Sequence, residues 1–166
     1  MRYTKKKIFW KPVGSSEKQV DALLYDEQKD YYGFIREQMA QNYHQVTITS
    51  EMMAEFISAV LSVPSYRIDD VQMMEEDEEL SDQITDAIRE SGTGTMNGRF
   101  ALMKVIRDIA EKSSIEIKRI TMSGKNSTSG NAEMFFVQSN GLIGVTSGDS
   151  ELERQLLILV KEHLEK

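Results

Sequence analysis

The chain has 166 residues, with 27 acidic and 20 basic side chains and a net charge of −7. Apolar residues make up 40% of the chain and charged residues 28%, which is typical of a globular protein that buries a core without disulfides. The absence of cysteine excludes thiolate metal sites and a cysteine nucleophile, and two histidines far apart argue against a multi-histidine metal site. Because the acidic surface repels phosphate backbones, we expect no nucleic-acid partner.

No segment has the features of a membrane span or a secretory signal. The apolar run that follows the basic residues 5–7 is only Ile8, Phe9 and Trp10, which is too short for a signal peptide. No stretch approaches the 18 apolar residues of a transmembrane helix. We therefore expect a cytoplasmic protein that does not insert into membranes.

Residues 1–45 are predicted to form an N-terminal arm and a helix. The arm is a short strand over residues 5–13. Ser16 and Gln19 have capping-box spacing, and apolar residues then recur roughly every 3.6 positions as far as Met39. The pattern indicates one long helix after the strand.

The next segment combines a strand signal with a strong helix signal. Residues 46–49 alternate as a short strand, and Thr49 or Ser50 can cap the helix that follows. Apolar pairs recur every four residues along this helix until Pro64 ends it.

An acidic segment, residues 69–79, holds seven carboxylates: Asp69, Asp70, Glu75, Glu76, Asp77, Glu78 and Glu79. Because like charges resist compaction, we expect this segment to be an exposed loop or a frayed helix. Ser81 is expected to cap the helix after it, and Gly92 to end that helix.

The C-terminal half is predicted to contain a helix, three strands and a terminal helix that Ser150 caps. The strands are expected at about 115–122, 133–138 and 142–146. The apolar phase changes in the first strand, which indicates a β-bulge near Lys118–Arg119. The predicted fold class is α+β, with a three-stranded antiparallel sheet packed by helices in a single domain spanning residues 1–166.

Asn140-Gly141 is a strong signal for a hairpin turn between the last two strands. If these two residues form the turn, Phe136 faces Val145. Phe136 would then be buried against the terminal helix.

Candidate catalytic and ligand-binding motifs do not match known patterns. The glycines near Lys125 and between residues 92 and 98 miss the phosphate-binding spacings. The acidic segment lacks the alternating order of a calcium loop and has no fixed partner for acid–base chemistry. We therefore predict that the protein is not an enzyme and that it binds no metal and no cofactor.

Methionine is frequent, with ten residues in the chain. Most are expected to fill the core, but methionine also suits adaptable binding surfaces because its unbranched side chain repacks easily. Two of them lie within the acidic segment, which makes that region the candidate partner-binding surface. Its candidate residues are Met73, Met74, Glu75, Glu76, Glu78 and Glu79.

From residue 46 to the end, the order of elements resembles the repeating half of the EspG-type chaperones of type VII (ESX) secretion systems, including their EsaE-like Gram-positive relatives. The resemblance is carried by a strand and proline-ended helix at 46–64, a helix running into glycine at 84–92, a helix and strand at 98–124, and two strands at 133–149. It implies an EspG-like α+β unit over residues 46–166, and residues 1–45 and the acidic segment depart from the family pattern.

The function that the resemblance implies is that of a non-catalytic chaperone or adaptor, which binds a helical secreted substrate in the cytoplasm. Two other readings remain. An immunity or antitoxin-like protein could use its acidic segment to cover the basic active site of a toxin. An enzyme would need acidic side chains to converge in space with His44 or His163.

Overall fold

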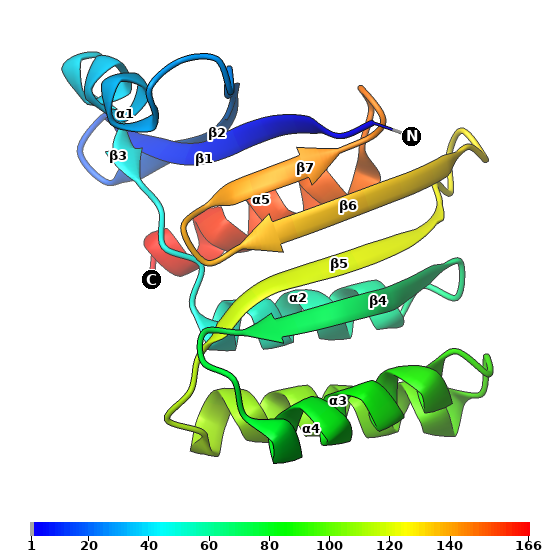
Figure 1. The fold of residues 1–166 in the computed structure, drawn as a ribbon. Helices are drawn as coiled ribbons and strands as arrows, with labels where there is room; N and C mark the ends of the chain where they lie inside the picture. Colours follow the sequence, from blue (N-terminus) through cyan, green and yellow to red (C-terminus); the bar gives the residue numbers. More distant parts are fainter. Residues whose placement is uncertain (1) are drawn as a thin grey trace.

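The computed structural model describes residues 2–166, which form five helices and one seven-stranded antiparallel sheet (Figure 1). In chain order the elements are β1 (Thr4–Val13), β2 (Glu17–Leu24), α1 (Tyr31–Ala40), β3 (His44–Gln45), α2 (Ser50–Leu61), β4 (Tyr66–Met73), α3 (Glu78–Ser91), α4 (Met96–Lys112), β5 (Ile117–Lys125), β6 (Ala132–Gln138), β7 (Leu142–Val145) and α5 (Glu151–Leu164). The predicted α+β class is confirmed, and the three predicted strands are β5, β6 and β7.

The strands lie in the order β2-β1-β7-β6-β5-β4, and β3 makes a short additional pair with β1. The first strand of the chain therefore lies beside the last one, with Thr4 opposite Val145. The predicted three-stranded sheet is too small, because β1, β2 and β4 extend it on both sides.

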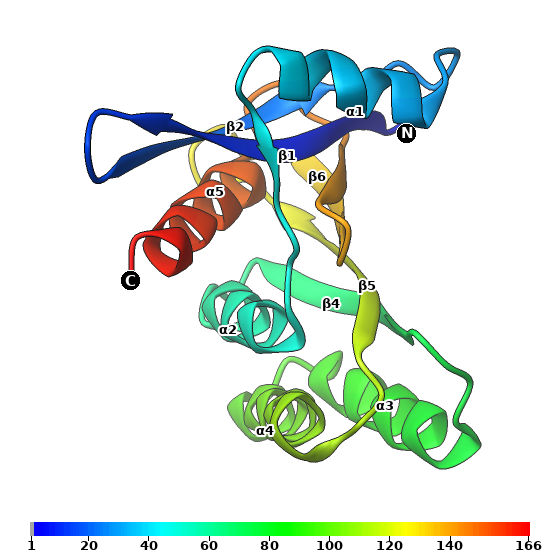
Figure 2. The same ribbon diagram turned by 90° about the vertical axis from the view of Figure 1, so that its left-hand side faces the viewer.

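The helices cover mainly one face of the sheet. Figure 2 shows α2, α4 and α5 on one side, and α1 on the other side above β1. Two groups of buried apolar side chains follow this division. Because consecutive residues of β1 point to opposite faces, Ile8 lies in the main core and Phe9 in a second, smaller cluster with Phe34 and Ile35 of α1. The helices α3 and α4 form a hairpin beyond β4 at the edge of the sheet (Figure 1).

The predicted long N-terminal helix is wrong. Residues Glu17–Leu24 form β2, which pairs with β1 around a turn that contains Gly14 at φ +76°. The apolar residues that suggested a helix also fit a strand, since Val20 and Ala22 both pack against the main core. Pairing with a neighbouring strand overrides the local capping signal, and the helix is confined to α1.

The predicted strand at residues 46–49 is also absent. Only His44 and Gln45 pair with β1, and the chain then runs extended to α2. The helix itself begins as predicted, because the Thr49 side chain accepts a hydrogen bond from the backbone N–H of Met52 at 3.2 Å.

The predicted bulge in β5 is confirmed. Gln72 lies opposite Arg119 and Met73 lies opposite Ile117, so Lys118 is an extra residue on β5. A second irregularity places an extra residue, Asp69, on β4. These extra residues change which side chains point toward the helices.

The hairpin between β6 and β7 is present, but its register differs from the predicted one by one residue. Phe135, rather than Phe136, lies opposite Val145, because the loop holds one more residue and ends at Gly141 with φ +84°. Phe136 is buried on the face away from α5. There the Tyr3 ring lies 5.0 Å from it, and the Arg119 guanidinium lies 3.9 Å from the centre of its ring.

Candidate functional site: an acidic groove beside β4

The acidic segment contributes to two regular elements. Its first residues belong to β4, and Glu78 and Glu79 begin α3. Asp77 caps α3, since its side chain accepts from the backbone N–H of Leu80 at 3.0 Å. Carboxylates in the first turn also interact favourably with the positive end of the helix dipole. The expected loop is therefore present only at residues 74–77, since the rest of the segment lies in β4 and α3, and the cap at Ser81 is wrong.

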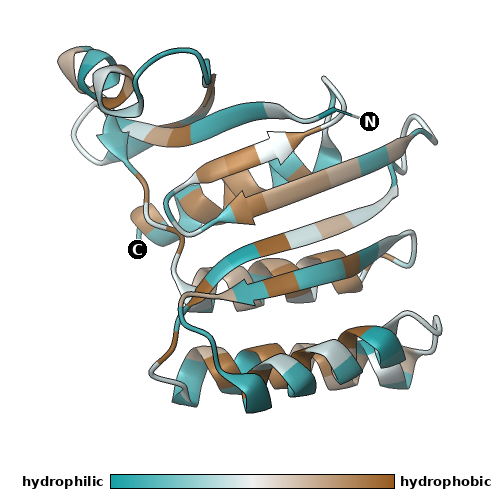
Figure 3. Ribbon diagram, in the orientation of Figure 1, coloured by the Kyte–Doolittle hydropathy of each residue, from teal (hydrophilic) through white to brown (hydrophobic). Residues whose placement is uncertain are grey.

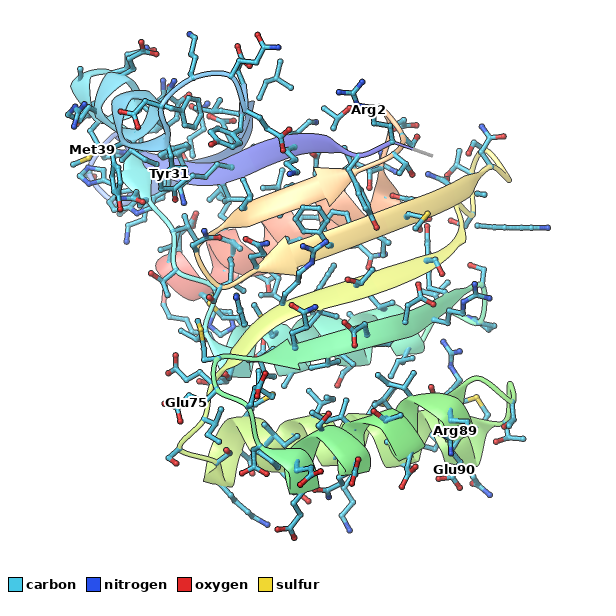
Figure 4. The ribbon with its side chains drawn as sticks, in the orientation of Figure 1. Arg2, Tyr31, Met39, Glu75, Arg89 and Glu90 are labelled. Carbon is cyan, nitrogen blue, oxygen red and sulfur yellow. The ribbon has the colours of Figure 1, made fainter. Side chains whose placement is uncertain are left out.

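The exposure expected for this segment is confirmed. Six of its seven acids are exposed, and only the capping Asp77 is half-buried. Figure 4 shows Glu75 at the junction of β4 and α3, at the far end of α3 from Arg89. In Figure 3 the outer side of α3 is predominantly hydrophilic, whereas the strands in the middle of the sheet are largely hydrophobic.

A groove of about 860 Å³ lies between the end of β4 and the start of α3. It is lined by five carboxylates and one amine, together with apolar and neutral polar side chains: Asp70, Val71, Gln72, Met73, Met74, Glu75, Glu76, Asp77, Glu78, Ser81, Ile84 and Lys118. We call this surface the acidic groove. Its inner wall is apolar, because Val71 and Ile84 belong to the main core. Met74 is 47% exposed.

The structure brings five of the six predicted partner-binding residues into this groove. Met73, Met74, Glu75, Glu76 and Glu78 line it together. The sixth, Glu79, lies on the other side of the first turn of α3.

That side carries a smaller hollow of about 470 Å³ between the start of α3 and the end of α4. Asp77 lines both hollows. Lys112, which also lines the smaller one, lies 3.7 Å from the Asp108 carboxylate and is therefore already paired.

The carboxylates of the acidic groove form no salt bridge within residues 2–166, and neither does Lys118. Unpaired like charges on an open surface produce a negative potential that attracts cationic groups. The arrangement therefore suits a basic ligand that also has an apolar side.

The prediction left out seven of the twelve residues that line the groove, and the two that lie farthest from the acidic segment in the sequence are Ile84 and Lys118. Ile84 reaches it from the second turn of α3, and Lys118 reaches it from the bulge in β5. The helical spacing of apolar residues already placed Ile84 on the buried side of the helix. The bulge prediction marked Lys118 as irregular, but nothing local indicated that it would lie beside residues 70–78.

A second group of carboxylates lies where α5 begins, and we call it the α5 anchor. Glu133 is 1% exposed, and its carboxylate accepts from the hydroxyls of Ser150 and Tyr66, the latter at 3.0 Å. The Tyr66 hydroxyl also lies 3.0 Å from Glu151, whose carboxylate accepts from the backbone N–H of Ser127 at 3.0 Å. Burial and the two carboxylates raise the pKa of Tyr66 well above its usual range.

The α5 anchor is closed and internally hydrogen-bonded, so it serves the fold. It fastens the start of α5 to the first residues of β4 and β6. The buried Arg99 has a similar role, because its guanidinium donates to the carbonyls of Leu61, Val63 and Tyr66 at 2.8–2.9 Å and links α4 to the end of α2.

The two histidines do not converge with each other. His44 stacks on Trp10 at 4.3 Å between ring centres. His163 of α5 lies 2.8 Å from the Glu55 carboxylate of α2. Neither lines the acidic groove. Within residues 2–166, no three metal-ligating side chains are grouped as a metal site.

None of the helices in the described part of the chain has the length and apolar character needed to span a membrane. No family model matches the chain, and no curated protein or solved structure is significantly similar to it.

Proposed function

We propose that this protein is a non-catalytic chaperone or adaptor that binds a basic helical segment of a partner protein in the acidic groove. The observation that carries the proposal is the combination of five carboxylates with an apolar inner wall in one groove of about 860 Å³. The resemblance to EspG-type chaperones, whose expected opening strand at 46–49 is absent here, is the basis of a more specific version. In it the partner is a secreted helical substrate of a type VII-like system and binding takes place in the cytoplasm.

The chemistry of the groove defines the partner. An amphipathic helix with lysine or arginine beside leucine or methionine would bring its charges to Glu75, Glu76 and Glu78. Its apolar side chains would cover Met73 and Met74. The unpaired carboxylates accelerate encounter with such a partner, and methionine adapts to side chains of different shape. Binding of this kind weakens as salt rises, because the charges that drive it are exposed.

The test is a titration with a helical secreted protein encoded beside this protein's gene, performed at low and at high salt. The groove variant replaces Glu75, Glu76 and Glu78 with Gln. We expect the groove variant to bind more weakly than wild type at low salt and to lose most of its salt dependence. Equal affinity of the two proteins at every salt concentration would remove the carboxylates from the binding surface.

A matched control variant makes the same change in net charge elsewhere. It replaces three exposed carboxylates that line neither hollow and form no ion pair: Glu17, Glu111 and Glu162. We expect the control variant to retain wild-type affinity. If it loses as much affinity as the groove variant, the effect reflects the overall charge of the protein and contradicts a groove-directed interaction.

The acidic groove also favours a second candidate function, that of an immunity or antitoxin-like protein. Catalytic sites of toxins that act on nucleic acids are basic, and an acidic groove is complementary to them. Deletion of the gene separates the two candidates. If the protein is a chaperone, deletion of its gene impairs secretion of its substrate. If it is an immunity protein, the deletion leaves secretion intact and makes cells sensitive to the linked toxin.

A further inference from the structure

Lys7 is a buried cation at the centre of β1. Its side chain is 0% exposed, and its amine donates a hydrogen bond to the backbone carbonyl of Asn140 in the β6–β7 turn. The amine also lies 5.7 Å from the ring centres of Phe9 and Tyr31. Tyr31 is the first residue of α1, so this helix forms part of the enclosure around the amine.

No carboxylate of the described residues pairs with this amine. The nearby acids have other partners: Glu27 pairs with Lys5, and Asp21 accepts from the Tyr43 hydroxyl at 3.0 Å. The neighbouring Lys11 lies over the Tyr43 ring, at 4.7 Å from its centre. Burial alone lowers the pKa of Lys7 to about 8. The enclosure therefore disfavours the charged amine, since one carbonyl and two aromatic rings replace its water and no carboxylate neutralises it.

The helix that closes this enclosure is weakly attached. Only Phe34 and Ile35 of α1 are buried, and they pack on Phe9 in the small cluster that is separate from the main core. Tyr32 and Met39 on the same helix are 70% and 54% exposed. A helix held by so few buried side chains opens at a lower free energy than the rest of the fold.

We infer that α1 is a cover whose docking onto β1 is weakened by the protonated Lys7 amine. When α1 is docked, the amine has one carbonyl and two aromatic rings around it. When α1 swings away, water hydrates the charge. The protonated amine therefore favours the open state, and the neutral amine favours the docked state. Opening would expose a lysine beside the aromatic side chains of the small cluster.

The test is hydrogen exchange of residues 31–40 at pH 7 and pH 9, corrected for the intrinsic pH dependence of exchange. For a pKa of about 8 when docked and the ordinary value when open, linkage predicts that protection of α1 increases roughly tenfold between these pH values. Tyr31 stays protonated over this range, because burial raises its pKa. The buried stripe of α5 serves as the internal reference, and we expect its protection to change much less.

Two variants test whether the Lys7 amine causes the pH dependence. Lys7→Met keeps the length of the side chain without the charge, and it should make α1 more protected at pH 7 and remove the tenfold pH dependence. Lys11→Met removes a half-buried lysine from the same strand and should leave that dependence intact. The inference is overturned if wild-type α1 protection does not rise relative to α5, or if Lys7→Met keeps the wild-type pH dependence.

Discussion

Glutamate carboxylates have opposite roles in the α5 anchor and in the acidic groove. In the anchor, the Glu133 carboxylate is almost fully buried and accepts hydrogen bonds from Tyr66 and Ser150. In the groove, the carboxylates of Glu75 and Glu76 are exposed and have no cationic partner within residues 2–166. A carboxylate with donors contributes to folding, whereas one without donors must stay in water or find a partner.

The largest effect is expected from an apolar residue next to the anchor, which sets the scale for the other changes. Phe135 lies two residues from Glu133 on the same face of β6 and is 0% exposed. Replacing Phe135 with Ala should lower the free energy of unfolding by roughly 3–5 kcal/mol, as measured by urea denaturation. A loss below about 1 kcal/mol would contradict its place in the main core.

Removing a donor from the anchor should have the next largest effect. Tyr66→Phe leaves the buried Glu133 with the Ser150 hydroxyl and without the phenol. The expected loss of unfolding free energy is about 1–3 kcal/mol, because a buried carboxylate loses a hydrogen bond that water cannot replace. An unchanged denaturation midpoint would show that the anchor does not depend on Tyr66.

Acid is expected to weaken the anchor through Glu151. Hydrogen bonds from Ser127 hold the pKa of Glu151 below its usual range. The stabilisation from Glu151 is therefore complete above the pKa that it has in the unfolded chain, and it is lost as pH falls through the lower, folded-state pKa. Glu151→Gln should flatten the acid side of the stability curve, measured by urea denaturation at a series of pH values. Glu75→Gln is the matched control and should leave that side of the curve unchanged.

The smallest effect on stability is expected in the groove. The groove variant, with Gln at positions 75, 76 and 78, should unfold within about 0.5 kcal/mol of wild type, because its exposed carboxylates make no contacts that the fold requires. A loss comparable to that of Tyr66→Phe would mean that these residues are structural. The contrast between the two regions would then disappear.

Local signals in the sequence were sufficient for much of the fold. The cap of α2 at Thr49, the cap of α5 at Ser150 and the bulge at Lys118 all depend on neighbouring residues, and all three are present. The strand β2 was missed because its pairing with β1 overrides a helix-like spacing of apolar residues. The strand β4 was missed because its pairing with β5 overrides the run of acidic residues. The hairpin register was wrong because Asn140-Gly141 indicates a two-residue turn, whereas the loop is longer.

The candidate site was also predicted only in part. The acidic segment is visible as a run of charge, and five of its six selected residues do line one groove. The groove itself depends on packing between elements. Its inner wall includes Ile84 of α3, and Lys118 enters from β5, so its shape arises only when the α3–α4 hairpin packs beyond β4.

The position of β1 has a consequence for how the chain acquires its fold during synthesis. This strand is synthesised long before its inner neighbour β7, so Thr4 cannot pair until Val145 has been made. Until then, β1 and β2 form an isolated hairpin, which has little stability by itself. Contacts that span almost the whole chain slow folding, since a long loop has to close before they form. We therefore expect the sheet to be completed late, when the β6–β7 hairpin has formed and β7 pairs with β1.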